Sequence, residues 1–532
     1  MVHVVSGHVF VINGDLTKIA CDALLIPTDS SFSFTSAWKA FVEPHRAHFK
    51  WSSGSMLSLP PQSGSPDVWL GNIGQQGNHS GSVLFEDFVS EFVQAALSEL
   101  GSRPDRERIY PWPRPRLAIN FLGSEGGGAK ELRGQLAAGL IRKLHELVSD
   151  CDVDILFVTF GTKPYAAAQR ARRDVLAKYS NIDEGIDETW RFDDRASPNL
   201  RQRAQELAQH ALESQLVLFI GAGVSAGAGL PDWKGLLSRI AAEAEFKPDQ
   251  IKALEKYDLR DQATVIETRL SLQGQHLRDR VAGQLTAYGH YSAAHGLLAS
   301  LPSREAVTTN FDCLYEVASR ISDQKLAVLP ESPRDTDGNW LLKLHGTLND
   351  PNGIVLTRSD FLNMPRQYGA LMGLVQALLM MRHMMFVGYS LSDEDFHELM
   401  HEVRDARRGV ATSINLGTLL TLIEDPIATQ LWGADLTVVS MMPSAGSEAD
   451  DLPTAARQLD IFLDLVGYLS ATSAAFFLDE SYQGLTDDEA DLREKLLELQ
   501  RLTEGAEPGK VAFMVRSFLD SMGAATRGAA TS

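Results

Sequence analysis

The residues with the clearest chemical potential form a glycine-rich loop directly after a buried strand. An apolar run at 216–220 leads into Gly221, Ala222, Gly223 and Ser225. Glycines allow a tight turn there, and backbone N–H groups at the start of the following helix attract the pyrophosphate of a dinucleotide. The loop therefore predicts dinucleotide binding, although a tight turn without any ligand would produce the same pattern.

Two polar side chains follow later apolar strands and suit acid–base chemistry. Asn310 comes after a run at 306–309, and His345 after a run at 341–344. Ligands bind open α/β sheets at the carboxyl ends of the strands, so both side chains are expected to enter one crevice. An amide offers a donor and an acceptor, and an imidazole with an ordinary pKa of about 6.5 is a general base. The plainer alternatives are a helix cap and a packed core histidine.

A series of short motifs in a fixed order extends this pattern. They are GAGVS at 221–225 with GLPDW at 229–233, TTNFD at 308–312, KLHG at 343–346 and GYSLSD at 388–393. Their order and sequences resemble the sirtuin superfamily. TTNFD, LTRSDF at 356–361 and GYSLSD resemble its bacterial branch in anti-phage defence proteins, including effectors of Thoeris-type systems. The resemblance implies hydrolysis of NAD to nicotinamide and ADP-ribose, as regulated depletion of NAD during infection.

The same resemblance implies roles for individual positions. Asn310 and His345 match the catalytic pair of the family. Phe311 and Asp312 match positions that face the nicotinamide carboxamide, and Ser390 matches one that contacts the adenosine side. The other positions expected to bind NAD are Gly221, Ala222, Gly223, Ser225, Pro231, Asp232, Trp233, Thr309 and Gly388.

Cysteine usage bears on the acceptor of the reaction. The three cysteines, Cys21, Cys151 and Cys313, lie far apart, so they form neither a disulfide framework nor a four-cysteine zinc site. Deacylating sirtuins carry a zinc module of paired cysteines, and this chain has no CxxC. Water is therefore the expected acceptor, without a metal. A protein deacylase or ADP-ribosyltransferase, and a non-catalytic sensor of NAD or ADP-ribose, remain as alternatives.

Other titratable residues have simpler explanations. His295 is a rival base, but it lies on an apolar helical face, which favours a structural role. Asp393, Asp395 and His397 have a spacing that resembles metal ligands, yet acidic residues there also cap and charge the first turn of a helix. No metal is assigned to them.

The beginning of the chain carries a second resemblance. NGDLTK at 13–18 and CDALLIP at 21–27 look similar to the opening of macro domains, whose acidic residue recognises adenine and is matched by Asp15. The loop positions then expected around phosphates are Gly126, Gly127, Gly128 and Gly161. Because 27–29 departs from the usual asparagine-rich segment, a sensor of an ADP-ribose-type nucleotide is favoured over a de-ADP-ribosylating enzyme. A divergent α/β domain used for assembly is the alternative.

Composition limits the partners and the location. With 49 basic and 69 acidic residues, the net charge of −20 opposes nucleic acid as the main ligand. The start lacks a signal-peptide pattern, and the apolar segment 370–389 carries Arg382 and His383 near its centre, so no membrane span is expected. These features predict a cytoplasmic protein. A homo-oligomer is also expected, because assembly could release an otherwise restrained activity.

The order of apolar runs in the 532 residues predicts an α/β protein of several parts. We expect a macro-like α/β domain at 1–180, an acidic linker at 181–200, a sirtuin-like domain at 201–445 and a helical C-terminal region at 446–532. The sirtuin-like domain is expected to contain a Rossmann-like, doubly wound parallel sheet. Its expected strands lie at 216–220, 306–309, 341–344, 384–387 and 436–439.

Overall fold

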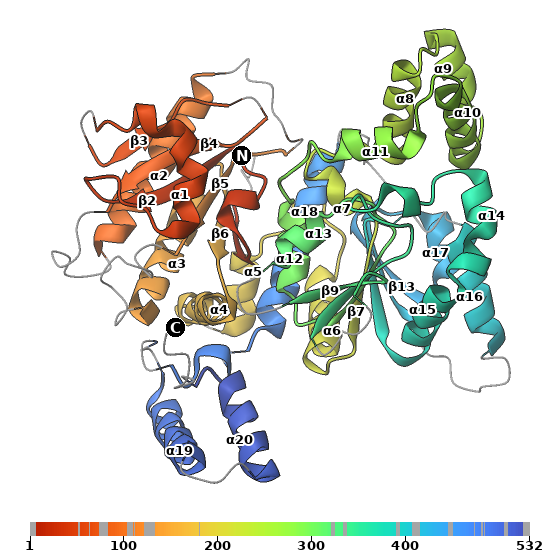
Figure 1. The fold of residues 1–532 in the computed structure, drawn as a ribbon. Coiled ribbons are helices and arrows are strands. Elements are labelled where there is room, and N and C mark those ends of the chain that lie inside the picture. Colours follow the sequence, from red (N-terminus) through yellow and green to blue (C-terminus); the bar gives the residue numbers. More distant parts are fainter. Residues whose placement is uncertain are drawn as a thin grey trace.

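The computed structural model gives two α/β units with a long helix, α18 (Leu452–Ser470), between their sheets (Figure 1). The residues that the structure describes are 7–51, 54–62, 64–73, 83–103, Tyr110, 112–121, 133–179, 181–320, 325–332, 338–389, 394–406, 415–444, 451–472, 474–479, Tyr482, 485–504 and 509–524. Mixed α/β architecture with parallel sheets confirms the predicted fold class.

The first unit is built on a six-stranded sheet with the order β1-β6-β5-β2-β4-β3, in which only β3 runs antiparallel to its neighbour. Its strands are β1 (Val9–Asn13), β2 (Ala23–Thr28), β3 (Met56–Ser58), β4 (Asp67–Asn72), β5 (Arg116–Asn120) and β6 (Asp154–Thr159). Its helices are α1 (Ser36–Val42), α2 (Val83–Gly101), α3 (Arg133–Asp150) and α4 (Thr162–Leu176).

Successive side chains of a strand point to opposite faces, so the two faces of this sheet have different neighbours. Val9 and Val11 lie in a core with residues of α2 and α3. Phe10 and Ile12 lie in the core that continues into α18 and the second unit. One hydrophobic core therefore spans the two units.

The second unit is built on a fully parallel seven-stranded sheet with the order β13-β12-β11-β7-β8-β10-β9. Its strands are β7 (Leu216–Ile220), β8 (Glu305–Thr308), β9 (Leu326–Leu329), β10 (Asn339–Lys343), β11 (His383–Val387), β12 (Gly417–Ile423) and β13 (Leu436–Met442). The order reverses at β7, because the chain continues to β8 on one side and returns to β11 on the other. This reversal confirms the predicted doubly wound sheet, and ligands of such sheets bind outside the carboxyl ends of the strands at this point.

Helices flank and extend this sheet. They are α6 (Leu200–Leu212), α7 (Gly223–Ala226), α8 (Trp233–Glu243), α9 (Pro248–Leu254), α10 (Leu259–Leu272), α11 (Leu277–Leu285), α12 (Ala293–Ser300), α13 (Leu314–Ala318), α14 (Arg358–Gln367), α15 (Gly369–Met381), α16 (Glu394–Ala406) and α17 (Pro426–Trp432). The helices α8, α9 and α10 project beyond the sheet at the upper right of Figure 1. None of the helices in the described ranges is long and apolar enough to cross a membrane.

Two segments are more closely packed than their sequences suggest. The acidic segment 181–200, expected as a linker, contains α5 (Ile182–Thr189) and the buried Trp190, whose indole N–H donates to Asp464 on α18 at 2.7 Å. Helical structure after residue 446 is confirmed, and α18 is an interior helix rather than a peripheral one. The helices α19 (Asp487–Glu504) and α20 (Lys510–Ser521) pair at the bottom of Figure 1.

Candidate functional site

The segments expected to form the site leave the sheet at one level of its carboxyl edge. Ile220 pairs with Thr308, and Thr308 pairs with Lys343, so β7, β8 and β10 end in register. Asn310 and His345 each lie two residues beyond these paired ends. The structure therefore brings the glycine loop, Asn310 and His345 to three neighbouring strand ends.

The glycine loop packs directly against the end of β11. The Gly221 N–H donates to the Val387 carbonyl at 2.9 Å, and the Gly223 N–H donates to the Gly388 carbonyl at 2.9 Å. Gly388 has φ of +65°, and a Cβ on Gly221 would lie 2.4 Å from the Gly388 oxygen. Such close backbone contact requires glycine at these positions. Ser390, expected on the same side, lies outside the described residues.

Asn310 is buried, and its amide faces the glycine loop. Nδ2 donates to the Gly221 carbonyl at 3.1 Å and to Ser225 Oγ at 3.2 Å. Oδ1 is buried and has no hydrogen-bond partner among the described residues. Asn310 does not cap α13, because that helix begins only at Leu314. The side chain therefore presents a buried acceptor with no partner among the described residues, which is uncommon in folded proteins and is typical of functional sites.

His345 is enclosed beside the same edge. Its side chain is buried, and its ring packs edge-on against Phe361 at 5.3 Å between centroids. The Val355 N–H donates to its carbonyl at 3.0 Å. Gly346 follows with φ of +88°, a conformation that favours glycine and turns the chain away after the histidine.

Asp312 is held by both of its carboxylate oxygens. Oδ1 accepts from the Leu314 N–H at 3.0 Å, and Oδ2 accepts from Ser225 Oγ at 2.9 Å. Asp312 thus helps to start α13 and also joins the polar cluster with Asn310.

Lys343, the first residue of the KLHG motif, supports the loop that carries Asp312. Its buried ammonium donates to the Asp312 carbonyl at 2.6 Å and to Glu316 Oε1 at 2.7 Å. Burial raises the pKa of Glu316, and the charge of Lys343 opposes that shift. A lysine directly after an apolar run, at the last position of β10, is the sequence signal for such a buried ion pair.

The remaining expected NAD-binding residues are divided between the loop and a nearby aromatic pair. The ring of Phe311 packs edge-on against that of Trp233, with 5.6 Å between the ring centroids. Trp233 directly follows Pro231 and Asp232 in the sequence. Asp232 caps α8 by accepting from the Gly235 N–H at 2.7 Å. Thr309 directly follows the end of β8, and Ala222 lies in the glycine loop.

Asp15 and Gly161, two of the residues expected for a macro-like site, follow the ends of β1 and β6, which pair at Asn13 and Thr159. Asp15 Oδ1 accepts from the N–H and the hydroxyl of Thr17, each at 2.8 Å. The Gly161 N–H donates to Asn13 Oδ1 at 2.9 Å, and Gly161 has φ of +107°. Gly126, Gly127 and Gly128 lie outside the described residues.

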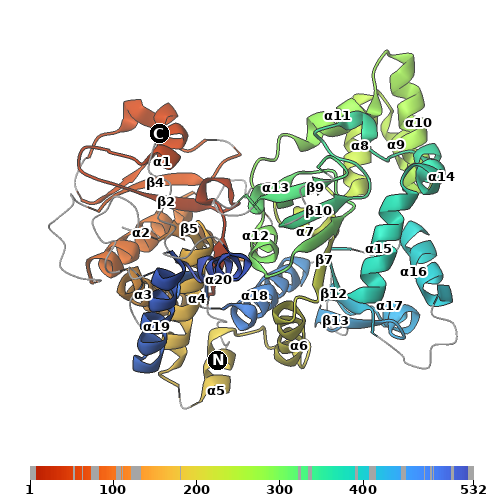
Figure 2. The same cartoon turned by 60° about the horizontal axis from the view of Figure 1, so that its bottom comes forward.

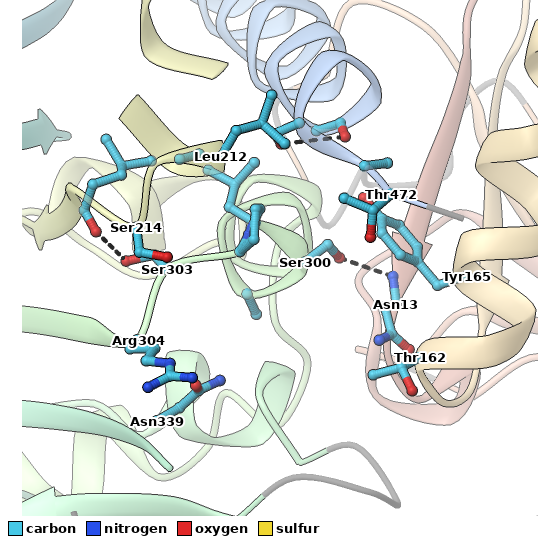
Figure 3. A pocket seen from close by; sticks show the side chains of 18 of the residues that line it. Asn13, Thr162, Tyr165, Leu212, Ser214, Ser300, Ser303, Arg304, Asn339 and Thr472 are labelled. Carbon is cyan, nitrogen blue, oxygen red and sulfur yellow. Dashed lines mark hydrogen bonds between the residues drawn. The ribbon is translucent and has the colours of Figure 1, made fainter. Parts of the chain in front are cut away.

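A cavity of about 580 Å³ lies between the two units at the opposite, amino edge of the second sheet. Figure 3 shows Arg304 and Asn339 on one side of it, and Asn13, Tyr165 and Thr162 on the other. It is therefore separate from the glycine loop. Within the described ranges, no group of three histidine, cysteine, aspartate or glutamate side chains is arranged to hold a metal ion.

Comparisons with known proteins concern mainly the second unit. A family model described as a SIR2-like domain matches residues 304–432. Defense-associated sirtuin 2 of Bacillus subtilis is 22% identical over 217 residues, 40% of this chain and 21% of that protein. NAD(+) hydrolase ThsA of Acinetobacter baumannii is 24% identical over 201 residues, 36% of this chain and 40% of that protein. ThsA of Cytobacillus dafuensis is 26% identical, over 36% of this chain and 38% of that protein.

Less than half of each of these relatives is therefore matched. Among solved structures, a mutant macrodomain of Oceanobacillus iheyensis with ADPR is similar, at 13% identity and a TM-score of 0.22, over 32% of this chain and 93% of that chain. The family match includes Asn310, His345 and the strands β8 to β11: residues 304–432 of the chain form a SIR2-like domain.

Proposed function

We propose that this protein hydrolyses NAD to nicotinamide and ADP-ribose, as a regulated NAD-depleting effector of bacterial anti-phage defence. Relatives named NAD(+) hydrolase ThsA and defense-associated sirtuin support the reaction class and the setting. The observation that carries the proposal is Asn310 Oδ1, a buried acceptor without a partner among the described residues, between the glycine loop and the strand that leads to His345.

The proposed chemistry needs an acceptor, a base and an exposed loop. The pyrophosphate of NAD lies against the exposed backbone of Ala222 and Gly223 in the glycine loop, because the N–H groups of Gly221 and Gly223 already bond the end of β11. Asn310 Oδ1 accepts from a ribose hydroxyl or from the attacking water. His345 takes the proton of that water as its oxygen bonds to the ribose carbon and nicotinamide leaves. The products are nicotinamide, ADP-ribose and one proton.

The test is product analysis with the purified full-length chain and NAD. We expect nicotinamide and ADP-ribose from the wild type, and rates at least about 10²-fold lower for Asn310→Ala and for His345→Ala. His276→Ala, which removes an exposed histidine of the same unit, is the matched control and keeps the wild-type rate. Absence of nicotinamide release under every condition, or an Asn310→Ala rate equal to the wild type, rejects the proposal.

Other products distinguish the alternative functions. Nicotinamide release that strictly requires an acylated peptide or a protein acceptor indicates a deacylase or an ADP-ribosyltransferase. Normal NAD binding without any product indicates a sensor.

Regulation by the first unit is part of the proposal, with an ADP-ribose-type nucleotide as its ligand. Main-chain bonds between the units support it: the Ala20 N–H donates to the Tyr291 carbonyl, and the Tyr291 N–H to the Lys18 carbonyl, each at 2.8 Å. The Tyr291 hydroxyl donates to the Asp15 carbonyl at 3.0 Å.

We expect added ADP-ribose to change the rate of NAD hydrolysis. Assembly of the cytoplasmic protein into a homo-oligomer, measured by light scattering, is expected to accompany that change in rate. A full rate without ligand, unaffected by ADP-ribose, contradicts regulation.

A further inference from the structure

His295 lies on the first turn of α12 and is completely buried, outside the pair to which we assign catalysis. Its Nδ1 lies 3.3 Å from the Ser292 N–H nitrogen and 2.8 Å from Ser292 Oγ. Its Nε2 lies 3.4 Å from Ser225 Oγ. The imidazole therefore connects the start of α12 to the serine of the glycine-loop motif.

The hydrogen bonds of Ser225 determine which imidazole nitrogen carries the proton. Asp312 Oδ2 lies 2.9 Å from Ser225 Oγ, and because a carboxylate only accepts, the single hydroxyl hydrogen of Ser225 points to Asp312. Asn310 Nδ2 donates to Ser225 Oγ, which leaves one lone pair for a second donor. His295 Nε2–H fills that position when Nδ1 accepts from the Ser292 N–H.

Burial supports a neutral imidazole in this arrangement. It lowers the pKa of His295 to about 4, although the charge of Asp312 opposes the shift. A neutral ring keeps one donor and one acceptor, and both are used here. A ring of this kind orients its partners but does not take up a proton near neutral pH.

Ser225 in turn decides which end of the Asn310 amide faces the ligand. With Nδ2 bonded to Ser225 Oγ and to the Gly221 carbonyl, Oδ1 is the end left without a partner among the described residues. A rotated amide would place oxygen against the Gly221 carbonyl, where two acceptors repel each other. The orientation of this amide therefore depends on a correctly donating Ser225 network.

We propose that His295 is a positioning residue, which acts through Ser225 to hold the Asn310 amide and the Asp312 carboxylate in the orientation that NAD hydrolysis requires. The proposal rests on the proposed function. It gives His295 a role in the site, whereas the apolar helical face around it in the sequence favoured a purely structural role.

Kinetics of paired variants test this role. His295→Leu keeps the side-chain volume and removes both ring hydrogen bonds, so kcat is expected to fall roughly 10- to 100-fold, with KM for NAD changed much less. His295→Gln keeps a donor near Nε2 and is expected to recover most of kcat. Ser225→Ala lowers kcat similarly, and the double variant His295→Leu/Ser225→Ala is no slower than the slower single variant, because both changes break the same connection.

The matched control is His383→Leu. His383 is a second buried histidine with a pKa lowered to about 4 by burial, and its Nε2 lies 2.9 Å from Thr418 Oγ1. It begins β11 at the amino edge of the sheet, so His383→Leu is expected to lower thermal stability and to leave kcat unchanged.

Two results overturn the proposal: a folded His295→Leu with wild-type kcat, or rate losses for His295→Leu and Ser225→Ala that multiply in the double variant. If His295→Leu does not fold, His295→Gln and Ser225→Ala carry the comparison, and a Gln variant as slow as Ser225→Ala rejects the proposal.

Nitrogen-15 spectra of the histidine rings give a readout that needs no catalysis. A neutral Nε2–H ring that shifts in Ser225→Ala supports the connection from His295 through Ser225 to Asn310, even if the wild type releases no nicotinamide and the proposed function fails. An Nδ1–H ring rejects this connection.

Discussion

At the scale of single residues, Lys343 is the cation on which the site loop depends. Its ammonium bonds the Asp312 carbonyl and the Glu316 carboxylate in a nearly solvent-free setting. Lys343→Met removes one partner of a buried ion pair and leaves the other without its cation. We expect the free energy of unfolding to fall by about 3–5 kcal/mol, measured by urea denaturation.

The compensating change separates lost charge pairing from lost packing. Glu316→Leu in the Lys343→Met background removes the stranded carboxylate, and such a replacement by apolar side chains is expected to restore most of the stability. The double variant should nevertheless remain slow in NAD hydrolysis, because the Asp312 carbonyl loses its donor. A Lys343→Met protein as stable as the wild type contradicts the assignment.

At the scale of elements, the site depends on the contact between the glycine loop and the end of β11. A Cβ on Gly388 would lie 2.5 Å from the Val224 nitrogen, and Gly388 has φ of +65°. Gly388→Ala is therefore expected to displace the loop and to raise KM for NAD at least about tenfold, with a stability loss of about 1–3 kcal/mol. Steady-state kinetics and thermal unfolding measure both effects.

The same substitution in open space is the control. Gly373 lies within α15, and a Cβ there would meet nothing within 4 Å. Gly373→Ala is expected to stabilise the protein by about 0.5–1 kcal/mol and to leave KM unchanged. Equal effects of the two alanines on KM would show that the loop contact is not needed.

Much of this arrangement could be predicted from the sequence because buried parallel strands are continuous apolar runs. The runs at 216–220 and 384–387 gave correct strands, and polar residues just after such runs had to reach the carboxyl edge. The contact of His295 with Ser225 could not be predicted, since it joins residues 70 positions apart through packing of α12. β9 and β12 were also missing from the expected strands.

At the scale of the whole molecule, α18 joins the two units through buried ion pairs on one of its faces. Arg457 pairs with Asp154, Asp460 with Arg116, and Asp464 with Arg172, at distances of 2.7–2.9 Å. His8 Nε2 lies 2.9 Å from Asp464 Oδ2, and burial lowers the pKa of this imidazole. Figures 1 and 2 both show α18 between the sheets. Its contacts with α6 and α12 on the other side make it part of the frame that carries the site.

Asp464 is the most heavily bonded member of this set. Its oxygens also accept from the Trp190 indole at 2.7 Å and from the Val11 N–H at 3.1 Å. Burial would raise the pKa of this carboxyl, but the charge of Arg172 and the hydrogen bond from His8 outweigh burial and lower it to about 2. A lowered folded-state pKa means that ionised Asp464 stabilises the fold above its ordinary value of 3.8, and that this stabilisation is lost as pH falls towards 2.

Asp464→Asn is therefore expected to lower the free energy of unfolding by about 3–5 kcal/mol at pH 7, because Arg172 keeps a buried charge without its partner. The comparison belongs in a His8→Gln background, which keeps a donor towards the carboxylate and removes the imidazole's own titration. Urea denaturation then measures the difference in free energy of unfolding between His8→Gln and His8→Gln/Asp464→Asn. This difference should be constant between pH 7 and pH 5 and should narrow by about 1 kcal/mol by pH 3. A difference that stays constant down to pH 3 would mean that the ionised carboxylate does not join the two units.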